Sequence, residues 1–308
     1  MCLSRLAALA CIALLPVQGP RAETLIRPPL DVDLVGEVRS VEARHEDTLL
    51  DIARRYSVGQ DEILHANPTV DRWLPEPGSQ VLVPTRHILP VARREGLILN
   101  IAEMRLYYFP PSQPGQPDVL QTYPVSIGRM DWNTPQGTTR VVSKTRNPEW
   151  RPPESIKEEH AADGEILPDV IPAGPDNPLG KYALRLGLPG YLIHSTNKPY
   201  GVGMRVTHGC VRMYPEDIET LFPEVPVGTP VQIVNQPVKI GWLGDTLFIE
   251  IHPPLEEDRE RLNLTHLAMD LVNTEWERRP FVLDGGALNR AIENRDGIPV
   301  AIARTVRE

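Results

Sequence analysis

Prolines set the first limit on what this chain can fold into. The sequence has 33 prolines among 308 residues, about twice the average proline content of roughly 5%. Proline lacks a backbone N–H and interrupts both helix interiors and central strands. A chain with so many prolines consists of short elements joined by loops, and the sequence therefore predicts a mostly β fold built from short strands.

The first 22 residues have the order of a secretory signal peptide. One Arg precedes an apolar run at residues 6–15, and Pro, Gly and Ala follow it. This run is too short to cross a membrane as a helix. We expect a signal peptide at residues 1–22, a periplasmic mature protein and no transmembrane segment in the mature chain. Lipid attachment at Cys11 is the alternative, which the short apolar run before this residue and the longer one after it disfavour.

Charge and cysteine content narrow the function. The formal net charge is −9 and no block of Lys or Arg occurs, which argues against a nucleic-acid partner. Cys2 and Cys11 leave with the signal peptide, so the mature chain keeps only Cys210. Exported proteins use cysteines mainly in disulfide pairs, and a single cysteine is either an intermolecular partner or a reactive thiol.

Residues 191–214, which read YLIHSTNKPYGVGMRVTHGCVRMY, surround this cysteine. The first residues are apolar and predict a buried strand that ends at His194; Cys210 follows 16 positions later, after a glycine-rich loop. A thiol that attacks a carbonyl needs a base and donors for the oxyanion. His194 suits the base, backbone N–H groups of residues 208–210 suit the donors, and Arg212 favours the thiolate or holds a substrate carboxylate. The alternative is a structural cysteine beside two ordinary histidines.

The segments IHST and THGCVRM resemble the signature of the L,D-transpeptidase (YkuD-type) catalytic domain. The resemblance implies that Cys210 is the nucleophile and His194 the proton donor and acceptor. It also implies that the backbone carbonyl of Ser195, where many members carry Gly, orients the imidazole of His194. The remaining implied site residues are His208 and Gly209 with Cys210 in the oxyanion hole, and Arg212 in substrate binding.

The same resemblance implies the reaction. A stem tetrapeptide of peptidoglycan is attacked to give a cysteine thioester with release of D-Ala, and the acyl group passes to an amine. The amine belongs to a second stem peptide, which gives a 3–3 cross-link, or to a lysine of an outer-membrane lipoprotein. Attack by water makes the protein an L,D-carboxypeptidase. No metal or organic cofactor is implied and no glycosyl transfer is expected. The alternative from another class is a non-catalytic peptidoglycan-binding protein of the cell wall.

The catalytic domain is expected at residues 93–234, with a β-sandwich or barrel-like fold. Residues 97–109 predict a hairpin, and 119–127, 182–186 and 231–234 predict further strands. The Pro-rich stretch 147–180 shows little strand pattern and is expected as an irregular loop, which by resemblance covers the active site as a lid.

Residues 37–84 predict a compact βααβ unit. Thr48 followed by Asp51 has the spacing of a helix capping box, and Asn67-Pro68 ends a second helix. The pieces DTLLDIARRY, ILHANP and PGSQVLVP resemble a LysM domain, which implies binding to N-acetylglucosamine-containing glycans such as peptidoglycan. The alternative is a small scaffold that binds nothing.

Residues 235–308 are expected to form an α-containing appendage that packs on the catalytic domain. A hairpin is predicted at 242–251 and helices at 255–277 and 287–294, without visible chemistry. The segment GWLGDTLFIEIHPPL resembles the tail of exported transpeptidases of Gram-negative bacteria, the ErfK/YbiS-like group.

Two other chemistries find little support in the sequence. A zinc site made from His194, His208, Cys210 and His252 lacks the closely spaced Cys or His pairs of known zinc motifs. A serine hydrolase would need G-x-S-x-G, which is absent from the sequence. The other histidines are expected at the surface: His45, His65, His87 and His160.

Overall fold

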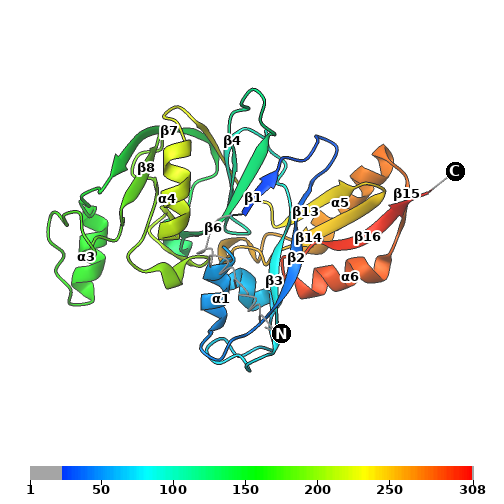
Figure 1. Ribbon diagram of the computed structural model, residues 1–308, viewed down its shortest axis with the longest axis horizontal. Helices are drawn as coiled ribbons and strands as arrows, with labels where there is room; N and C mark the ends of the chain where they lie inside the picture. Colours follow the sequence, from blue (N-terminus) through cyan, green and yellow to red (C-terminus); the bar gives the residue numbers. More distant parts are fainter. Residues whose placement is uncertain (1–22, 307–308) are drawn as a thin grey trace, which may run out of the picture.

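The computed structural model describes residues 23–306 and shows three units side by side (Figure 1). The predicted signal peptide, with Cys2 and Cys11, lies outside these described residues. Within residues 23–306, no helix combines the length and apolar character needed to span a membrane. Each unit has a cluster of buried apolar side chains of its own.

The first unit has the predicted βααβ order. Its elements are β2 (Leu34–Glu42), α1 (Leu49–Arg55), α2 (Gln60–Ala66) and β3 (Gln80–Ile88). The two strands pair antiparallel along their whole length, and both extend further than the sequence suggested. Thr48 and Asp51 form the predicted capping box, in which each side chain accepts from the other residue's backbone N–H. Leu49, Ile52 and Ile63 face the strands and form the centre of the unit.

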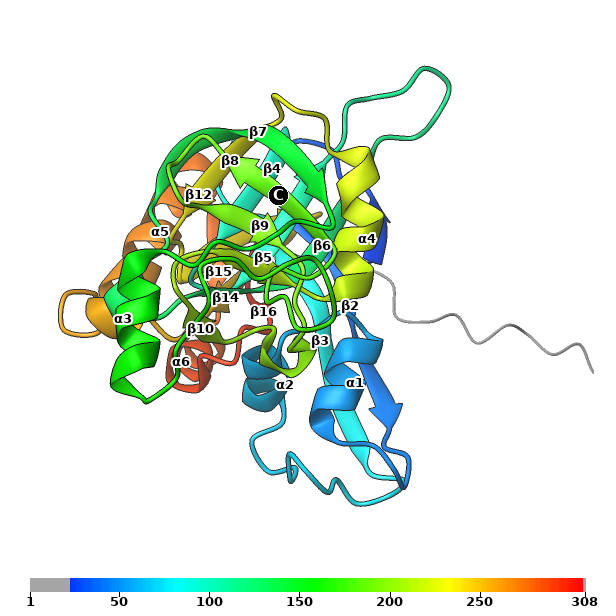
Figure 2. The same ribbon diagram turned by 90° about the vertical axis from the view of Figure 1, so that its left-hand side faces the viewer.

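The second unit is a strongly curved sheet. Its strands run in the order β6-β11-β9-β8-β7-β12-β4-β5, and β5 pairs again with β6, so the sheet closes into a barrel-like ring (Figure 2). Closure leaves few unpaired strand edges. The bounds are β4 (Gly96–Asn100), β5 (Arg105–Phe109), β6 (Val119–Gly128), β7 (Gly137–Arg146), β8 (Tyr182–Leu186), β9 (Leu192–His194), β11 (Val211–Met213) and β12 (Pro230–Val234). Two further strands pair with β6: β1 (Glu23–Ile26) and β10 (Arg205–Thr207).

Helices of the second unit connect and flank these strands. The helix α4 (Pro215–Glu224) begins with Pro at its first turn, a position that needs no backbone N–H. Short 3-10 turns are η1 (Met130–Trp132) and η2 (Pro199–Gly201). The expectation of an irregular loop at 147–180 is wrong in part, because it contains the helix α3 (Glu154–Ala162). Ile156 is the only buried residue of this helix, so its sequence shows no apolar stripe. The short Pro-containing segment before residue 37, for which no strand was predicted, contains β1.

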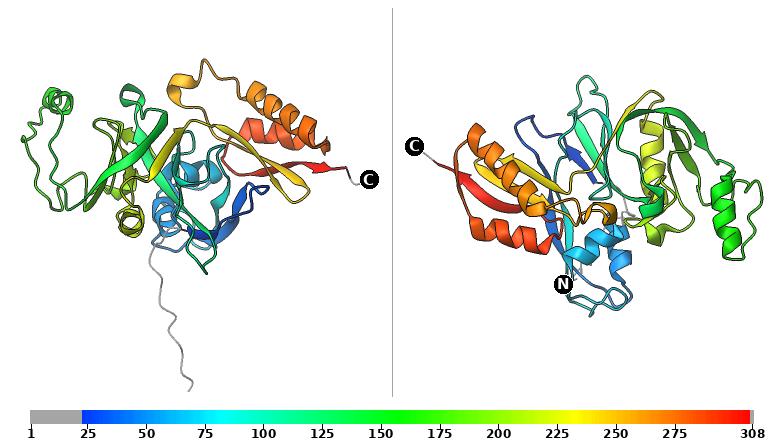
Figure 3. Two further views of the ribbon diagram at one scale, coloured as in Figure 1. Left: turned by 90° about the horizontal axis from the view of Figure 1, so that it is seen from above. Right: turned by 180° about the vertical axis from the view of Figure 1, so that it is seen from behind.

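The third unit was expected as an α-containing appendage with one hairpin, and it contains a four-stranded sheet. Its four strands form an antiparallel sheet in the order β13-β14-β16-β15, and α5 and α6 cover one face of it (Figure 3). The bounds are β13 (Val238–Leu243), β14 (Thr246–Ile251), η3 (Glu256–Asp258), α5 (Leu264–Arg278), β15 (Phe281–Leu283), α6 (Gly285–Asn294) and β16 (Val300–Thr305). Strands β13 and β14 pack against β2 and β3 of the first unit, and Lys239 of β13 pairs with Glu103 of the second unit.

Candidate active site

The sheet places Cys210 beside His194. His194 is the last residue of β9, and Cys210 immediately precedes β11. These two short strands pair in parallel, with Arg212 directly opposite His194. Cys210, His194, His208 and Arg212 line one cavity of about 410 Å³. A single strand pairing thus brings together a histidine and a cysteine that are 16 positions apart in the sequence.

The imidazole of His194 is buried and has a defined orientation. Its Nδ1 lies 2.6 Å from the backbone carbonyl oxygen of Ser195. A carbonyl can only accept, so Nδ1 carries the proton and Nε2 is left unprotonated. Burial, and then the positive charge of Arg212, lower the pKa of His194 to about 4, although the backbone contacts with Ser195 and Leu179 oppose this shift. At neutral pH His194 is therefore a neutral base.

The thiol of Cys210 is also neutral at rest. Burial raises its pKa, and this effect exceeds the lowering by the backbone N–H of Leu192 and by the charges of Arg212 and Arg185. Its Sγ lies 3.6 Å from the carbonyl oxygen of Gly190. Neutral thiol and neutral imidazole together mean that the proton moves when the sulfur attacks, since a standing thiolate–imidazolium pair is disfavoured.

The turn before Cys210 is held by side chains. Gly209 has φ +94°, and a Cβ at this position would lie 2.8 Å from Cε1 of Tyr191, so only glycine fits. Thr207 donates from Oγ1 to the Cys210 carbonyl at 2.6 Å, and Thr134 donates from Oγ1 to the Gly209 carbonyl at 2.9 Å. Both bonds fix the peptide planes that a backbone oxyanion hole requires.

Comparison with known proteins decides the family. Residues 94–233 match the L,D-transpeptidase catalytic domain. The chain is 39% identical over 299 residues to the probable L,D-transpeptidase YcfS of Escherichia coli K12. The match covers 92% of this chain and 89% of the relative. This chain belongs to the L,D-transpeptidase family. A second E. coli K12 relative, the probable L,D-transpeptidase ErfK/SrfK, is 38% identical over 295 residues and 93% of each chain.

Among solved structures, the chain is similar to an L,D-transpeptidase from Mycobacterium smegmatis. It has 20% sequence identity to this chain and a TM-score of 0.35, over 51% of this chain and 63% of that one.

In this member of the L,D-transpeptidase family, Cys210 is open to a second cavity. This cavity measures about 580 Å³ and is lined by Trp132, Tyr191 and Arg185 in addition to Cys210. Trp150, Ile156 and Leu179 line both cavities. The sulfur can therefore be approached from two sides, with an arginine in each cavity.

The segment 147–180 is held at its base and through α3. At its base Asn177 is buried and donates from Nδ2 to the carbonyls of Pro148, at 2.9 Å, and Pro172, at 3.1 Å. Further out, the Glu159 carboxylate of α3 lies 3.0 Å from Nε2 of His208 and also pairs with Arg129. The imidazole of His208 thereby links the covering helix to the turn that carries Cys210.

Sequence reasoning found one part of this L,D-transpeptidase site and missed another. The structure brings together His194, Ser195, His208 and Cys210 with Arg212, all from one contiguous segment. Glu159 comes from α3, Arg185 from β8 and Arg129 from the turn before η1, and no local pattern pointed to them. His252 lies in the third unit and bonds to Glu250 at 2.6 Å, so the four ligands of the alternative zinc site do not meet.

The expectation that His87 is a surface residue is wrong, because its side chain is buried under the third unit. Among residues 23–306 its ring belongs to the one group with metal-ligand spacing, His87, Glu103 and Glu250, whose ligand atoms lie within 4.8 Å of one another. However, Lys239 Nζ lies 2.6 Å from Glu103 and 2.8 Å from Glu250, so an ammonium group already occupies the cationic position.

Proposed function

We propose that this protein is an exported L,D-transpeptidase that acts on the stem tetrapeptides of peptidoglycan through a thioester on Cys210. The observation that carries this proposal is the shared cavity of Cys210 and a buried neutral His194 whose Nδ1 proton is held by Ser195. This arrangement leaves Nε2 as the base for the thiol.

The first half-reaction makes the thioester. As Sγ of Cys210 attacks the carbonyl between the third stem residue and D-Ala, the thiol proton passes to Nε2 of His194. Backbone N–H groups around Gly209 stabilise the oxyanion. The intermediate then collapses with cleavage of the C–N bond, and His194 gives its proton to the amine of the departing D-Ala.

The second half-reaction consumes the thioester. An acceptor amine attacks the same carbonyl, loses a proton to His194, and the C–S bond breaks to restore the thiol. The two cavities beside Cys210 support separate paths for donor and acceptor. Among residues 23–306, the buried Nε of Arg212 has no hydrogen-bond partner, which supports its role in holding a carboxylate of the substrate.

The acceptor is a second stem peptide or a lysine of an outer-membrane lipoprotein. In a bacterium that contains this gene, muropeptide analysis with and without the gene separates the two. Loss of 3–3 cross-links identifies the first acceptor, and loss of wall-bound lipoprotein identifies the second.

The βααβ unit is proposed to bind glycan as a LysM domain, and the mature protein to reside in the periplasm. The order of elements and the capping box at Thr48 support the first proposal. The loop after α2 exposes Trp73 and Leu74, which gives a sugar ring an apolar surface to contact.

The test of the catalytic proposal is Cys210→Ala. This variant should release no D-Ala from tetrapeptide muropeptides and should still bind peptidoglycan. A carbapenem should add its mass to Cys210 of the unaltered protein. Undiminished D-Ala release by the variant would refute the mechanism, and an unlabelled wild-type cysteine would favour a non-catalytic wall-binding protein.

A further inference from the structure

The residues that lead to the nucleophile touch all three units. We call residues 202–210 the nucleophile segment. On one side it meets the first unit, where Gln60 N–H donates to the Val202 carbonyl at 3.0 Å and Asp61 N–H donates to the Gly203 carbonyl at 3.1 Å. Gly203 has φ +87°, and a Cβ there would lie 2.3 Å from Cα of Gly59. The two backbones approach this closely because both residues are glycine.

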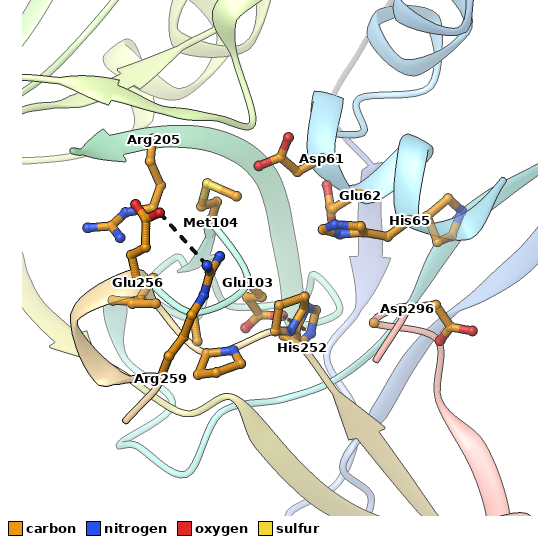
Figure 4. A pocket seen from close by; sticks show the side chains of 16 residues that line it. Asp61, Glu62, His65, Glu103, Met104, Arg205, His252, Glu256, Arg259 and Asp296 are labelled. Atoms are coloured by element: carbon orange, nitrogen blue, oxygen red, sulfur yellow. Dashed lines mark ion pairs between the residues drawn. The ribbon is translucent and has the colours of Figure 1, made fainter. Parts of the chain in front are cut away.

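On another side the nucleophile segment meets the third unit. Arg205 binds Glu257 through two parallel contacts, Nη1 to Oε2 at 2.7 Å and Nη2 to Oε1 at 3.0 Å. The side chains are only 17% and 27% exposed. Bidentate, largely buried ion pairs of this kind are stronger and more directional than single surface contacts. A cavity of about 220 Å³ lies where the three units meet. Arg205 and Asp61 of α2 are among the side chains that line it (Figure 4).

Arg205 is connected to Cys210 by a short series of bonds. Its Nε donates to the Gly128 carbonyl at 3.2 Å, and its strand β10 pairs with the end of β6. Two positions further on, Thr207 accepts from Arg129 N–H at 3.0 Å through its carbonyl and donates from Oγ1 to the carbonyl of Cys210. A shift of β10 therefore moves the peptide planes on both sides of the sulfur.

We propose that Glu257 of the third unit is a positioning residue for Cys210, acting through Arg205. The proposal rests on the proposed function, because it assigns to the C-terminal unit a part in the same cysteine chemistry. Glu257 does not touch the reacting atoms. It holds β10 in place from outside, while α2 holds the start of the nucleophile segment from the first unit. A misplacement of about 1 Å can slow a reaction roughly a hundredfold, so this contact matters for rate more than for stability.

The test compares Glu257→Gln with Glu256→Gln in the full-length mature protein. Glu256 is the adjacent residue and is more than half exposed. It lies 3.8 Å from Arg259, which is a weak surface ion pair, so loss of its charge should not change the rate. The acylation of Cys210 by a carbapenem is followed over a range of carbapenem concentrations. We expect Glu257→Gln to lower the limiting rate constant by about tenfold or more, with carbapenem affinity unchanged and Glu256→Gln like wild type.

The acylation data distinguish partial unfolding of the variant from misplacement of the Cys210 sulfur. Unfolded protein lowers the fraction of molecules that become acylated, whereas a misplaced sulfur lowers the rate constant of the folded ones. Glu257→Asp keeps the charge with a shorter reach and should restore part of the rate. Arg205→Gln combined with Glu257→Gln should be no slower than Arg205→Gln alone, because Arg205→Gln already removes the contact that Glu257→Gln removes.

A limiting rate constant of Glu257→Gln equal to that of Glu256→Gln would overturn the positioning role while leaving the proposed function intact. Failure of the wild-type protein itself to be acylated would instead overturn the proposed function.

Discussion

Replacement of Lys239 by Met should strongly destabilise the fold. Lys239 is 1% exposed and lies between the Glu103 and Glu250 carboxylates, both 0% exposed. Its Nζ also donates to the Ile88 carbonyl at 2.6 Å, so all three ammonium protons have acceptors. These groups come from all three units, and Lys239→Met would leave two buried carboxylates without their cation.

The magnitude follows from the burial of the cluster. Removing one partner of a buried ion pair costs about 3–5 kcal/mol of unfolding free energy. At about 2–4 °C per kcal/mol for a chain of this size class, the melting temperature at pH 7 should fall by roughly 6–20 °C. Lys181→Met is the matched control, because Lys181 is exposed and its substitution should change the melting temperature by at most about 2 °C. Thermal unfolding followed by circular dichroism measures both.

The loss should depend on pH in a defined direction. Burial raises the pKa of Glu103, Lys239 lowers it, and the net shift is upward. Burial also raises the pKa of Glu250, but Lys239 and His252 outweigh it, so the net shift is downward. Without Lys239 both carboxyl pKa values rise, so the folded variant binds protons more tightly than the unfolded chain and loses stability as pH rises. The destabilisation should therefore shrink at pH 5. A fall no larger than that of Lys181→Met, or one that grows on acidification, would refute the reasoning.

Three further outcomes are expected. Burial raises the pKa of Asp217 to about 7. The folded protein therefore keeps this proton to higher pH than the unfolded chain does, and stability is lost as pH rises from about 4 through 7. Asp217→Asn should have a higher melting temperature than wild type at pH 8 but not at pH 4. Because the pKa of His194 is about 4, carbapenem acylation of Cys210 should persist to about pH 5 and fall near pH 4; a half-loss near pH 6.5 would contradict a neutral buried base. Burial lowers the pKa of His208 and Glu159 opposes this, so Glu159→Gln should lower that pKa further in an NMR titration and speed hydrogen exchange of α3, whereas exposed Glu158→Gln should do neither.

Local patterns in the sequence predicted much of the fold. The βααβ unit, the hairpin of β4 and β5, and α4 were predictable because each has its own periodicity and its own start and stop residues. The helix α3 was not, since Ile156 alone is buried on it and tertiary contacts stabilise it. The strand β1 was missed because its partner β6 lies about a hundred positions away.

The same division applies to the site. His194, Cys210 and Arg212 were predictable because they lie within one segment of 19 residues, positions 194–212. Glu159 reaches His208 across 49 positions and Glu257 reaches Arg205 across 52. His87 was misjudged because the third unit, far along the chain, covers it. Contacts of this range depend on the relative placement of the units, which no window of sequence displays.

The glycine contact between α2 and the nucleophile segment would restrict how the proposed activity operates on peptidoglycan. A sugar-binding module on a flexible tether would let the active site search a wide area around its anchor. Here Gly59 lies against Gly203 and the Arg105–Glu62 pair joins the same two units at 2.7 Å. With glycan held on the βααβ unit, the sulfur would sit at a fixed offset from the bound strand, and only stem peptides at that spacing along the polymer would come within its reach.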